Sequence, residues 1–461
     1  MQIPALRGKK SVHFTGIGGI GMSSLAQLAR SCGLAVTGSD RANDKGRDQW
    51  LYEKLARQGI ELFLQTEGGI RTTPDCFVVS RAIEENNTDL RAARDQELPV
   101  LKMSDVLASL VNGRPSVGVS GSCGKSTTTA MITLILEQAG FDPTGVLGAV
   151  AKRYTSDDCV GNLRFGQGEH VVAEVDESDG SVRDFHPEVA VLTNISKDHF
   201  ETDCLEKFFR AFLDGARQVV LNADCELSSV LLEEFKGRAV TFGLQGAVRP
   251  EQLALECRSS RFKVDSLPFI IPVPGRHNVQ NALCAIAAAR CFDIPDEFSQ
   301  KALAEYEGLQ RRWDLAGSPR GIDVIDDFAH SPAKIECALA TAHLARGNVH
   351  AVFQPHGYGP TRFLWNEYLN VFSTTLGDQD CLYLLDIFDA GGTADRTISS
   401  DDLAGSLRKN ISRIERPSDR HSLVDLIRGR ASPGDLILVM GARDNSLTDL
   451  TREIAQALTH E

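Results

Sequence analysis

Short apolar runs, each bounded by glycine or polar residues, recur along the chain and alternate with longer segments of helical periodicity. Ser11–Thr15 and Ser116–Ser120 are two such runs, and a glycine-rich turn follows each of them. After the second turn, residues 127–139 carry apolar side chains at the spacing of a buried helix: Ala130, Met131, Ile132, Leu134, Ile135 and Leu136. Buried strands that alternate with helices predict an α/β fold with parallel, doubly wound sheets.

Three such α/β blocks divide the 461 residues, a length that suits about three domains of ~150 residues. We predict a Rossmann-like N-terminal domain at 1–110, a central phosphate-loop domain at 111–307 and a Rossmann-like C-terminal domain at 308–461, each with a mostly parallel sheet. Residues 239–273 should form β structure interrupted by prolines. The other expected strands are 35–38, 76–80, 100–101, 170–175, 189–193, 322–325, 348–353, 381–385 and 435–440, and the expected helices are 205–216 and 278–291.

Composition and charge say little about the fold, but they disfavour several classes of function. A hydrophobic share of 42% and a charged share of 24% are ordinary for a globular protein. The net charge of −13 disfavours nonspecific binding to nucleic acid or to an anionic membrane. No apolar run reaches the ~18 residues of a membrane-spanning helix. Eleven scattered cysteines, without a Cys-x-x-Cys motif or a secretory leader, favour the reducing cytoplasm. We expect a monomer or a homodimer.

The first glycine-rich turn matches the spacing G-x-G-x-x-G between a strand and a helix. Gly16, Gly18 and Gly21 supply the glycines, and Asp40 follows at the end of the next expected strand. This pattern indicates a pyrophosphate held at a helix N-terminus, with an acidic residue near a ribose. A dinucleotide satisfies it, and so does a nucleotide sugar. Close packing of the strand against the helix is the alternative interpretation.

The second turn, Gly121-Ser-Cys-Gly-Lys-Ser, has the chemistry of a phosphate loop. Loop N–H groups and a helix N-terminus face an anion, Lys125 supplies a positive charge, and the Ser126 hydroxyl can reach Mg²⁺. The spacing departs from the usual one because Val119 stands where a glycine is common. The strand before it and the helix after it nevertheless favour ATP binding over a plain turn. Oxidation of Cys123 within this loop would block ATP.

Acidic and imidazole side chains follow two later strands. Residues 173–179 place Glu174 and three further carboxylates at the end of an apolar strand, where side chains face the ligand crevice of a parallel sheet. One of them should bind Mg²⁺, although a solvated acidic loop is the alternative. His199 ends the next strand and becomes a candidate ligand for a second metal ion. Mg²⁺ prefers oxygen, so composition alone would not assign this histidine to it.

Asn278 and Asn281 lie three residues apart at the start of an expected helix and therefore share one helical face. Amide groups both donate and accept hydrogen bonds, which suits the edge of an adenine ring. Asn278 could instead serve only as a helix cap.

The order of these motifs resembles the Mur ligase family, whose members are ATP-dependent amide-forming enzymes of peptidoglycan synthesis. The branch that joins L-alanine to UDP-N-acetylmuramate is the most similar one. As a set, the motifs are specific, and they span nearly the whole chain: residues 13–22, 121–129, 173–179, 193–199, 274–278, 311–313, 326–332 and 353–356.

The resemblance implies a role for each matching position. The loop residues Gly121, Gly124, Lys125, Ser126 and Thr127 would bind ATP, with Lys125 on its β- and γ-phosphates. Ser126 and Glu174 would bind one Mg²⁺ and His199 a second. Asn278 and Asn281 would face adenine, and His330 would lie near the incoming amine. The remaining implied contacts are Arg312 and Asp327 to ATP, and Gly16, Gly18, Gly19, Gly21, Asp40 and Arg362 to the substrates.

The family reaction implied by the resemblance begins when a carboxylate attacks the γ-phosphoryl group of ATP. The resulting acyl phosphate is attacked by an amine, and phosphate leaves. Lys125, Glu174, His199 and His330 would be the catalytic residues, and closure of the domains would exclude water from the acyl phosphate.

Departures from the family pattern cluster where the amino substrate should bind. Gly357 and Pro360 replace two arginines that hold the amino acid in the alanine-adding branch, and only Arg362 remains. Neither replacement can bind a carboxylate bidentately. The run from Asp326 to Pro332 is nearer the murein-peptide branch, which adds a recovered tripeptide. Asp214 stands where some family members carry a carbamylated lysine, so no carbamate is expected. The acceptor is then either not simply L-alanine or is alanine held differently.

Two further hypotheses remain from the sequence. A nicotinamide-dependent oxidoreductase would explain the first glycine-rich turn but not the second phosphate loop or Glu174. A non-catalytic, Mur-like nucleotide-binding protein is the other, since a fold does not determine a function. The intact Lys125, Glu174 and His199 argue against it.

Overall fold

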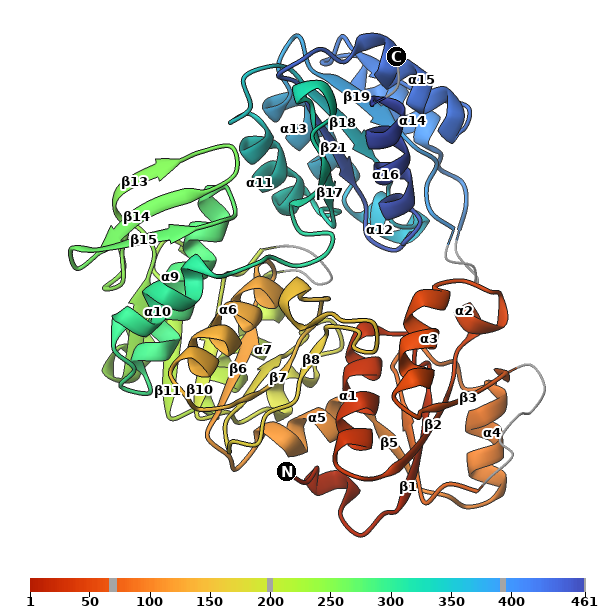
Figure 1. The fold of residues 1–461 in the computed structure, drawn as a ribbon, viewed down its shortest axis with the longest axis vertical. Coiled ribbons are helices and arrows are strands. Elements are labelled where there is room, and N and C mark those ends of the chain that lie inside the picture. The colour runs from red at the N-terminus through yellow and green to blue at the C-terminus, as the bar shows by residue number, and fades with distance from the viewer. Residues whose placement is uncertain (66–72, 197–201, 390–394, 460–461) are drawn as a thin grey trace. The chain divides into compact units, whose positions relative to one another are not determined.

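The computed structural model describes residues 1–65, 73–196, 202–389 and 395–459. Within these ranges the strands form four sheets, and three of them are large and mostly parallel (Figure 1). The large sheets follow one another along the chain, and each is built from strands that alternate with helices. The α/β class predicted from the hydrophobic pattern is therefore confirmed.

The first sheet has five parallel strands in the order β3-β2-β1-β4-β5. Its central strand has four buried residues in a row, because helices cover both faces of a parallel sheet. The strands are β1 (Ser11–Thr15), β2 (Ala35–Ser39), β3 (Glu61–Phe63), β4 (Phe77–Val79) and β5 (Val100–Lys102). The helices are α1 (Ile20–Ser31), α2 (Arg41–Asp44), α3 (Gln49–Arg57), α4 (Thr88–Asp95) and α5 (Met103–Val111).

The second sheet has seven strands in the order β12-β11-β10-β6-β9-β7-β8, and only β8 runs antiparallel to its neighbour. Strand β6 lies between β10 and β9, which brings the chain segments after these three strands to one edge. The strands are β6 (Ser116–Ser120), β7 (Thr144–Val146), β8 (Leu163–Arg164), β9 (Val171–Glu174), β10 (Val189–Leu192), β11 (Gln218–Asn222) and β12 (Ala239–Phe242). The helices are α6 (Lys125–Gln138), α7 (Thr202–Asp214) and α8 (Ser229–Phe235).

A small sheet of three strands, in the order β13-β14-β15, follows and accounts for the rest of the β structure predicted at 239–273. Two helices then lead to the last part of the chain. The elements are β13 (Glu251–Leu255), β14 (Ser260–Val264), β15 (Leu267–Ile271), α9 (Arg276–Arg290) and α10 (Asp296–Ala304).

The third large sheet has six strands in the order β16-β17-β21-β18-β19-β20, with only β16 antiparallel. The strands are β16 (Asp314–Gly317), β17 (Asp323–Asp327), β18 (Val349–Phe353), β19 (Cys381–Leu384), β20 (Ile414–Glu415) and β21 (Leu436–Met440). The helices are α11 (Pro332–Ala342), α12 (Tyr358–Phe363), α13 (Trp365–Thr375), α14 (Ser400–Leu407), α15 (Arg420–Arg430) and α16 (Leu447–Ala457).

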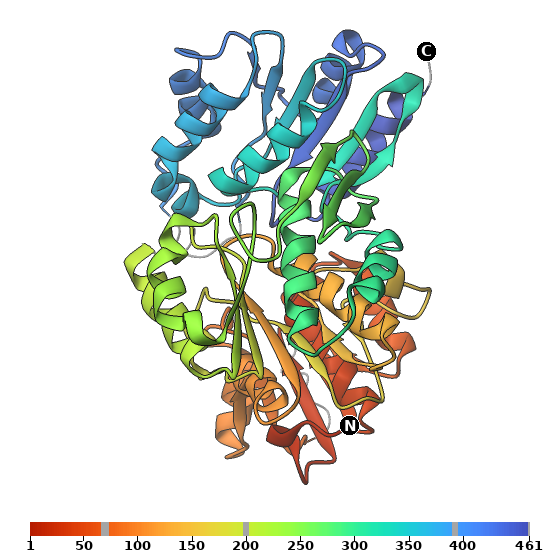
Figure 2. The same cartoon turned by 90° about the vertical axis from the view of Figure 1, so that its left-hand side faces the viewer.

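Alternate residues of this sheet belong to two different hydrophobic cores. In β21, Leu438 and Met440 pack with α11, α13 and α14, whereas Ile437 and Val439 pack with α15 and α16. This division follows from the period of two along a strand, which turns successive side chains to opposite faces. Figure 2 accordingly shows helices on either side of these strands.

The chain forms two compact units. The first comprises residues 1–252, 262–270 and 280–307, and the second comprises 253–261, 271–279 and 308–461. The predicted division into three domains at residues 110 and 307 stays a prediction. Within the described ranges, no helix combines the length and the apolar character that crossing a membrane requires.

Candidate active site

The phosphate loop predicted from the sequence connects β6 to α6, and two of its positions require glycine. Gly121 has a φ of +125° and Gly124 a φ of +87°. A Cβ atom at Gly121 would overlap Thr193 Oγ1, and one at Gly124 would overlap Asn281 Oδ1. Gly124 is also the N-cap of α6, so the helix N-terminus directly follows the loop. This strand–loop–helix arrangement can bind the phosphates of a nucleotide.

The segment after β10 holds the loop in place. Thr193 Oγ1 and Asn194 Nδ2 both donate to the Cys123 carbonyl oxygen, at 2.6 and 2.9 Å. In return, the Cys123 N–H donates to Asn194 Oδ1 at 3.0 Å. Cys123 is therefore fixed through its backbone, while its thiol is free and partly buried. The sequence drew attention to residues 193–199 for a metal-binding histidine, but Thr193 and Asn194 support the loop.

Lys125 is held between the loop and a buried carboxylate. Its Nζ lies 2.7 Å from the Gly121 carbonyl oxygen and 2.7 Å from Glu177 Oε2. Burial opposes the charged form of Lys125, but the charges of Glu177 and its acidic neighbours outweigh it and raise the pKa of the ammonium group. Burial raises the pKa of Glu177, which is only 2% exposed, while Lys125 counteracts this rise. Lys125 is therefore protonated and desolvated beside the loop.

Glu174 ends β9 directly beside the loop strand. Strand β9 pairs with β6 in parallel, with Val119 opposite Glu174. Glu174 Oε2 accepts a hydrogen bond from the Gly148 N–H at 3.0 Å. Ser126, in the first turn of α6, is buried. Carboxylate and hydroxyl oxygens are donors that Mg²⁺ prefers, so these two residues fit the predicted ion.

His199, the expected ligand of a second ion, lies outside the described residues. Among residues 1–65, 73–196, 202–389 and 395–459, no group of three or more His, Cys, Asp or Glu side chains could by itself hold a metal ion. Water and ATP phosphates commonly complete the shell of Mg²⁺ in nucleotide sites, so two protein ligands are compatible with such a site.

Asn278 and Asn281 share the first two turns of α9, as the sequence predicted. Asn281 Oδ1 accepts a weak hydrogen bond from Thr128 Oγ1 at 3.4 Å and packs closely against Gly124. Asn278 Nδ2 donates to the Pro274 carbonyl oxygen at 2.7 Å. Asn281 thus supports the phosphate loop directly, while contact of either amide with adenine stays a prediction.

The first glycine-rich turn, which contains Gly16, Gly18, Gly19 and Gly21, connects β1 to α1 as expected. Asp40 reaches back to this turn, because its Oδ2 accepts the Gly18 N–H at 2.8 Å. Its other oxygen, Oδ1, accepts the Ala42 N–H at 2.8 Å and caps α2. Asp40 therefore orders the turn, and its predicted contact with a ribose is not tested by these bonds.

In the second unit, Asp327, Arg312 and His330 lie around the end of β17. Asp327 accepts hydrogen bonds from the Trp313 and Ala329 N–H groups at 2.7 and 2.8 Å. Burial raises the pKa of Asp327 against the opposing charge of Arg312. The Arg312 guanidinium lies over the Phe328 ring, 4.6 Å from its centre. Asp327 thus ties two loops together, and its predicted contact with ATP stays a prediction.

His330 is a buried, neutral histidine at the same edge. Its Nδ1 donates to the Phe328 carbonyl oxygen at 2.8 Å, because that oxygen can only accept, and its Nε2 faces Lys334 Nζ at 3.4 Å. Burial, with the charge of Lys334 next, lowers the pKa of His330 well below its usual range. The His356 ring packs against it, with ring centres 4.7 Å apart. The sequence analysis did not mention Lys334, and it included His356 only as the last residue of the motif at 353–356.

Arg362, the remaining predicted substrate arginine, is already engaged. It forms an ion pair with Asp395 Oδ2 at 3.1 Å and donates to Thr397 Oγ1 at 2.9 Å. Gly357 immediately precedes α12 with a φ of +145°, and Pro360 lies inside that helix. No sequence signal pointed to Arg443, although its guanidinium lies against Gly357.

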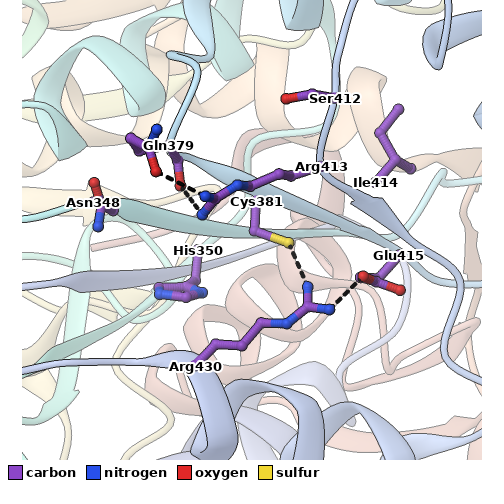
Figure 3. Close-up of a pocket in the computed structure, with 9 residues that line it drawn as sticks. All are labelled: Asn348, His350, Gln379, Cys381, Ser412, Arg413, Ile414, Glu415 and Arg430. Atoms are coloured by element: carbon purple, nitrogen blue, oxygen red, sulfur yellow. Dashed lines mark hydrogen bonds and ion pairs between the residues drawn. The ribbon is translucent and has the colours of Figure 1, made fainter.

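A separate cavity of about 410 Å³ lies at the opposite edge of the six-stranded sheet (Figure 3). Apart from Arg430, which ends α15, its lining residues lie just before or within β18, β19 and β20 near their starts, whereas ligands of parallel α/β sheets bind at the carboxyl ends of strands. Its two arginines are engaged, since Arg430 binds Glu415 at 2.6 Å and Arg413 donates to the amide oxygen of Gln379 at 2.7 Å. We therefore do not assign the reaction to this cavity.

Three family models match consecutive parts of the chain. The one described as Mur ligase family, catalytic domain matches residues 11–115, and the Mur ligase middle domain matches 119–289. The one described as Mur ligase, glutamate ligase domain matches 311–443. The loops with Gly18, Lys125 and His330 each fall within one of these three matches.

Curated relatives match over nearly the whole length of the chain. The UDP-N-acetylmuramate–L-alanine ligase of Myxococcus xanthus is 34% identical and covers 98% of this chain and 96% of its own. That of Mesorhizobium japonicum is 33% identical and covers 94% of each chain.

Solved structures show the same fold. The UDP-N-acetylmuramate-alanine ligase MurC of Thermotoga maritima has a TM-score of 0.79 at 26% identity, covering 97% of this chain and 98% of its own. A murein peptide ligase of Psychrobacter arcticus has a TM-score of 0.68 at 22% identity, covering 98% and 99%. Because the family models and the relatives together account for most of its length, the chain belongs to the Mur ligase family.

Proposed function

We propose that this protein is an ATP-dependent ligase that joins L-alanine to the carboxylate of UDP-N-acetylmuramate in the cytoplasm. The observation that carries the proposal is the phosphate loop, with a protonated Lys125 held 2.7 Å from both Gly121 and Glu177, beside Glu174. The names of the relatives supply the two substrates. An oxidoreductase is not favoured, because nothing in hydride transfer needs this loop.

The loop and Lys125 stabilise the phosphoryl group that is transferred. When ATP binds, the Lys125 ammonium exchanges Glu177 for the β- and γ-phosphates, and the N–H groups at the start of α6 bind their oxygens. Ser126 and Glu174 would hold Mg²⁺, which supplies further positive charge to the phosphates. The sugar carboxylate attacks the γ-phosphorus, which gives an acyl phosphate and releases ADP. The alanine amine attacks the acyl carbon, and inorganic phosphate leaves as the amide forms.

His330 is suited to position the amine rather than to remove its proton. A histidine whose pKa lies well below 6.5 is a poor general base near neutral pH. Its neutral ring can still accept a hydrogen bond at Nε2, where Lys334 now donates. We therefore expect the amine to attack as the free base, and the reaction to need a pH at which some alanine is deprotonated.

Phosphate release measured with ATP, Mg²⁺ and UDP-N-acetylmuramate tests the proposal against a panel of amino acids and short peptides. We expect turnover with L-alanine, dependent on both ATP and the nucleotide sugar. The murein-peptide alternative, favoured only by the run from Asp326 to Pro332, predicts turnover with a tripeptide and none with L-alanine. A non-catalytic, nucleotide-binding protein would bind ATP and release no phosphate with any member of the panel.

A further inference from the structure

Three loops of the second unit meet at the carboxyl edge of the six-stranded sheet. Strand β21 lies between β17 and β18, with Met440 in register with both Asp327 and Phe353. The loop after β17 carries His330, the loop after β18 carries His356 and Gly357, and the loop after β21 carries Arg443. In parallel α/β sheets this edge binds ligands.

The backbone that leads to Arg443 is rigidly held. The Gly441 N–H donates to the Asp327 carbonyl oxygen at 3.2 Å, which continues the pairing of β21 with β17. The buried guanidinium of Arg311 donates to the Gly441 carbonyl oxygen at 2.7 Å and to that of Ala442 at 3.1 Å. The side chain of Arg443 therefore starts from a fixed point at the edge of the sheet.

Arg443 reaches into the space that a side chain at position 357 would occupy. Its Nη1 lies 3.5 Å from the point where a Cβ of residue 357 would stand, and Gly357 leaves that point empty. A φ of +145° at Gly357 is a conformation that other residues rarely adopt. The family arginine that is missing from position 357 is thus matched by a guanidinium that arrives from another loop.

The guanidinium of Arg443 is available to a ligand. Its residue is exposed, and no hydrogen bond or ion pair joins it to any other residue in the described ranges. The neighbouring carboxylate of Asp444 is turned away, because it accepts from Ser446 and lies 3.5 Å from Arg420. Arg362, by contrast, is neutralised by Asp395.

A second cation, Lys334, contacts the histidine pair of the same loops. The Lys334 ammonium contacts His330 Nε2 at 3.4 Å, and the His330 ring packs against that of His356, the residue before Gly357. Lys334 thus lies against the first ring of this pair, and Arg443 lies against the glycine that follows the second. A small molecule with one carboxylate and one amine matches this set of groups.

We propose that Arg443 binds the carboxylate of the incoming amino acid in this protein, in place of the arginines absent from positions 357 and 360. This inference rests on the proposed function and names the specificity-determining residue of its acceptor site. A guanidinium can bind a carboxylate through two parallel hydrogen bonds, which orients the amine as well as attracting the charge.

Steady-state kinetics of Arg443→Ala, Arg443→Lys and the wild type with L-alanine and with L-alaninamide test this proposal. L-Alaninamide keeps the amine and lacks the carboxylate. For Arg443→Ala we expect the KM for L-alanine to rise about 10- to 100-fold, as for the loss of a charged hydrogen-bonding partner. The KM for L-alaninamide should change less than twofold. The KM of Arg443→Lys for L-alanine should lie between those of the wild type and Arg443→Ala. Lysine keeps the positive charge but lacks the paired N–H donors of a guanidinium.

Arg452→Ala is the matched control, since Arg452 is an exposed arginine on α16 whose one ion pair among the described residues is with Asp449 at 3.2 Å. Its kinetics should equal those of the wild type. Acyl phosphate trapped with hydroxylamine, in the absence of L-alanine and L-alaninamide, should form equally in all variants. If Arg443→Ala and the wild type prefer L-alanine over L-alaninamide to the same degree, the inference is wrong. If the wild type itself does not use L-alanine, the proposed function fails instead.

Discussion

At the scale of single residues, variants of the Lys125–Glu177 pair should affect folding stability and turnover separately. Lys125→Ala leaves a buried carboxylate without its partner, which should lower the free energy of unfolding by about 3 kcal/mol. It should also lower turnover by about 100-fold or more, because the transferred phosphoryl group loses a fixed positive charge. The double variant Lys125→Ala with Glu177→Gln should regain most of the stability and none of the turnover. Thermal unfolding and phosphate release measure the two effects.

The same pair predicts a pH dependence for the Lys125→Ala variant. Burial raises the pKa of Glu177 in the folded protein, and loss of Lys125 removes the main opposing charge. A carboxyl group whose folded pKa is raised is stabilising below its unfolded pKa, and its contribution is lost as the pH rises through the folded value. The variant should therefore be closer to the wild type at pH 5 than at pH 8. An equal deficit at both pH values would show that Glu177 stays charged.

The loop glycine Gly121 makes a third prediction at this scale. Gly121→Ala should destabilise by ~1 kcal/mol for its positive φ and by a further ~1–3 kcal/mol for the overlap with Thr193. Gly140→Ala is the control, because Gly140 has a φ of +83° but no atom within 4 Å of the added Cβ. Gly140→Ala should lower the free energy of unfolding by only the ~1 kcal/mol that comes from the positive φ. ATP should protect Gly140→Ala against heat and fail to protect Gly121→Ala.

At the scale of elements, helix α9 contains a histidine that predicts acid sensitivity. Burial lowers the pKa of His277 to about 4, and a positive charge in the first turn would also oppose the helix dipole. Unfolded histidine binds protons near pH 6.5, so the free energy of unfolding should fall as the pH drops from about 6.5 towards 4. The melting temperature of His277→Gln should change less with pH over this range than that of the wild type. A variant as acid-sensitive as the wild type would exclude His277 as the cause.

The elements predicted best from the sequence are those with continuous apolar runs. Strands β1 and β6 begin and end where the hydrophobic pattern placed them, because both faces of each strand are buried. Strand β16 was missed, since none of its four residues is buried and they carry no apolar period at this antiparallel edge. Strand β11, although fully apolar in its middle, lay in a segment that showed no motif and was also missed.

The candidate site residues also fall into two groups: those with a local signal in the sequence and those whose position depends on how distant segments pair. Lys125, Ser126 and Glu174 could be singled out as candidates because loop chemistry and strand ends are local in sequence. The buried partner Glu177 was seen only as one charge of an acidic run, since its distance to Lys125 depends on how β9 pairs with β6. Arg443 gave no signal at all, because its relation to Gly357 joins two loops 86 positions apart in the numbering.

At the scale of the whole molecule, the two compact units should unfold separately. One large core runs through the first unit, and two further cores cover the faces of the six-stranded sheet in the second. We expect calorimetry to resolve two transitions. Binding of an ATP analogue to the phosphate loop should raise the temperature of the transition that belongs to the first unit.

Asn162 allows a direct test of whether the two units unfold separately. It joins the five-stranded and seven-stranded sheets inside the first unit. Its buried amide donates to the Ile20 carbonyl oxygen at 2.7 Å and accepts from Gln27 Nε2 at 2.8 Å. Asn162→Ala leaves these groups unsatisfied, at a cost of about 1–3 kcal/mol. The transition raised by the ATP analogue should fall by roughly 2–6 °C and the other should not move. Asn410→Ala, an exposed amide of the second unit, should shift neither, whereas equal shifts of both transitions in Asn162→Ala would mean that the molecule unfolds as one body.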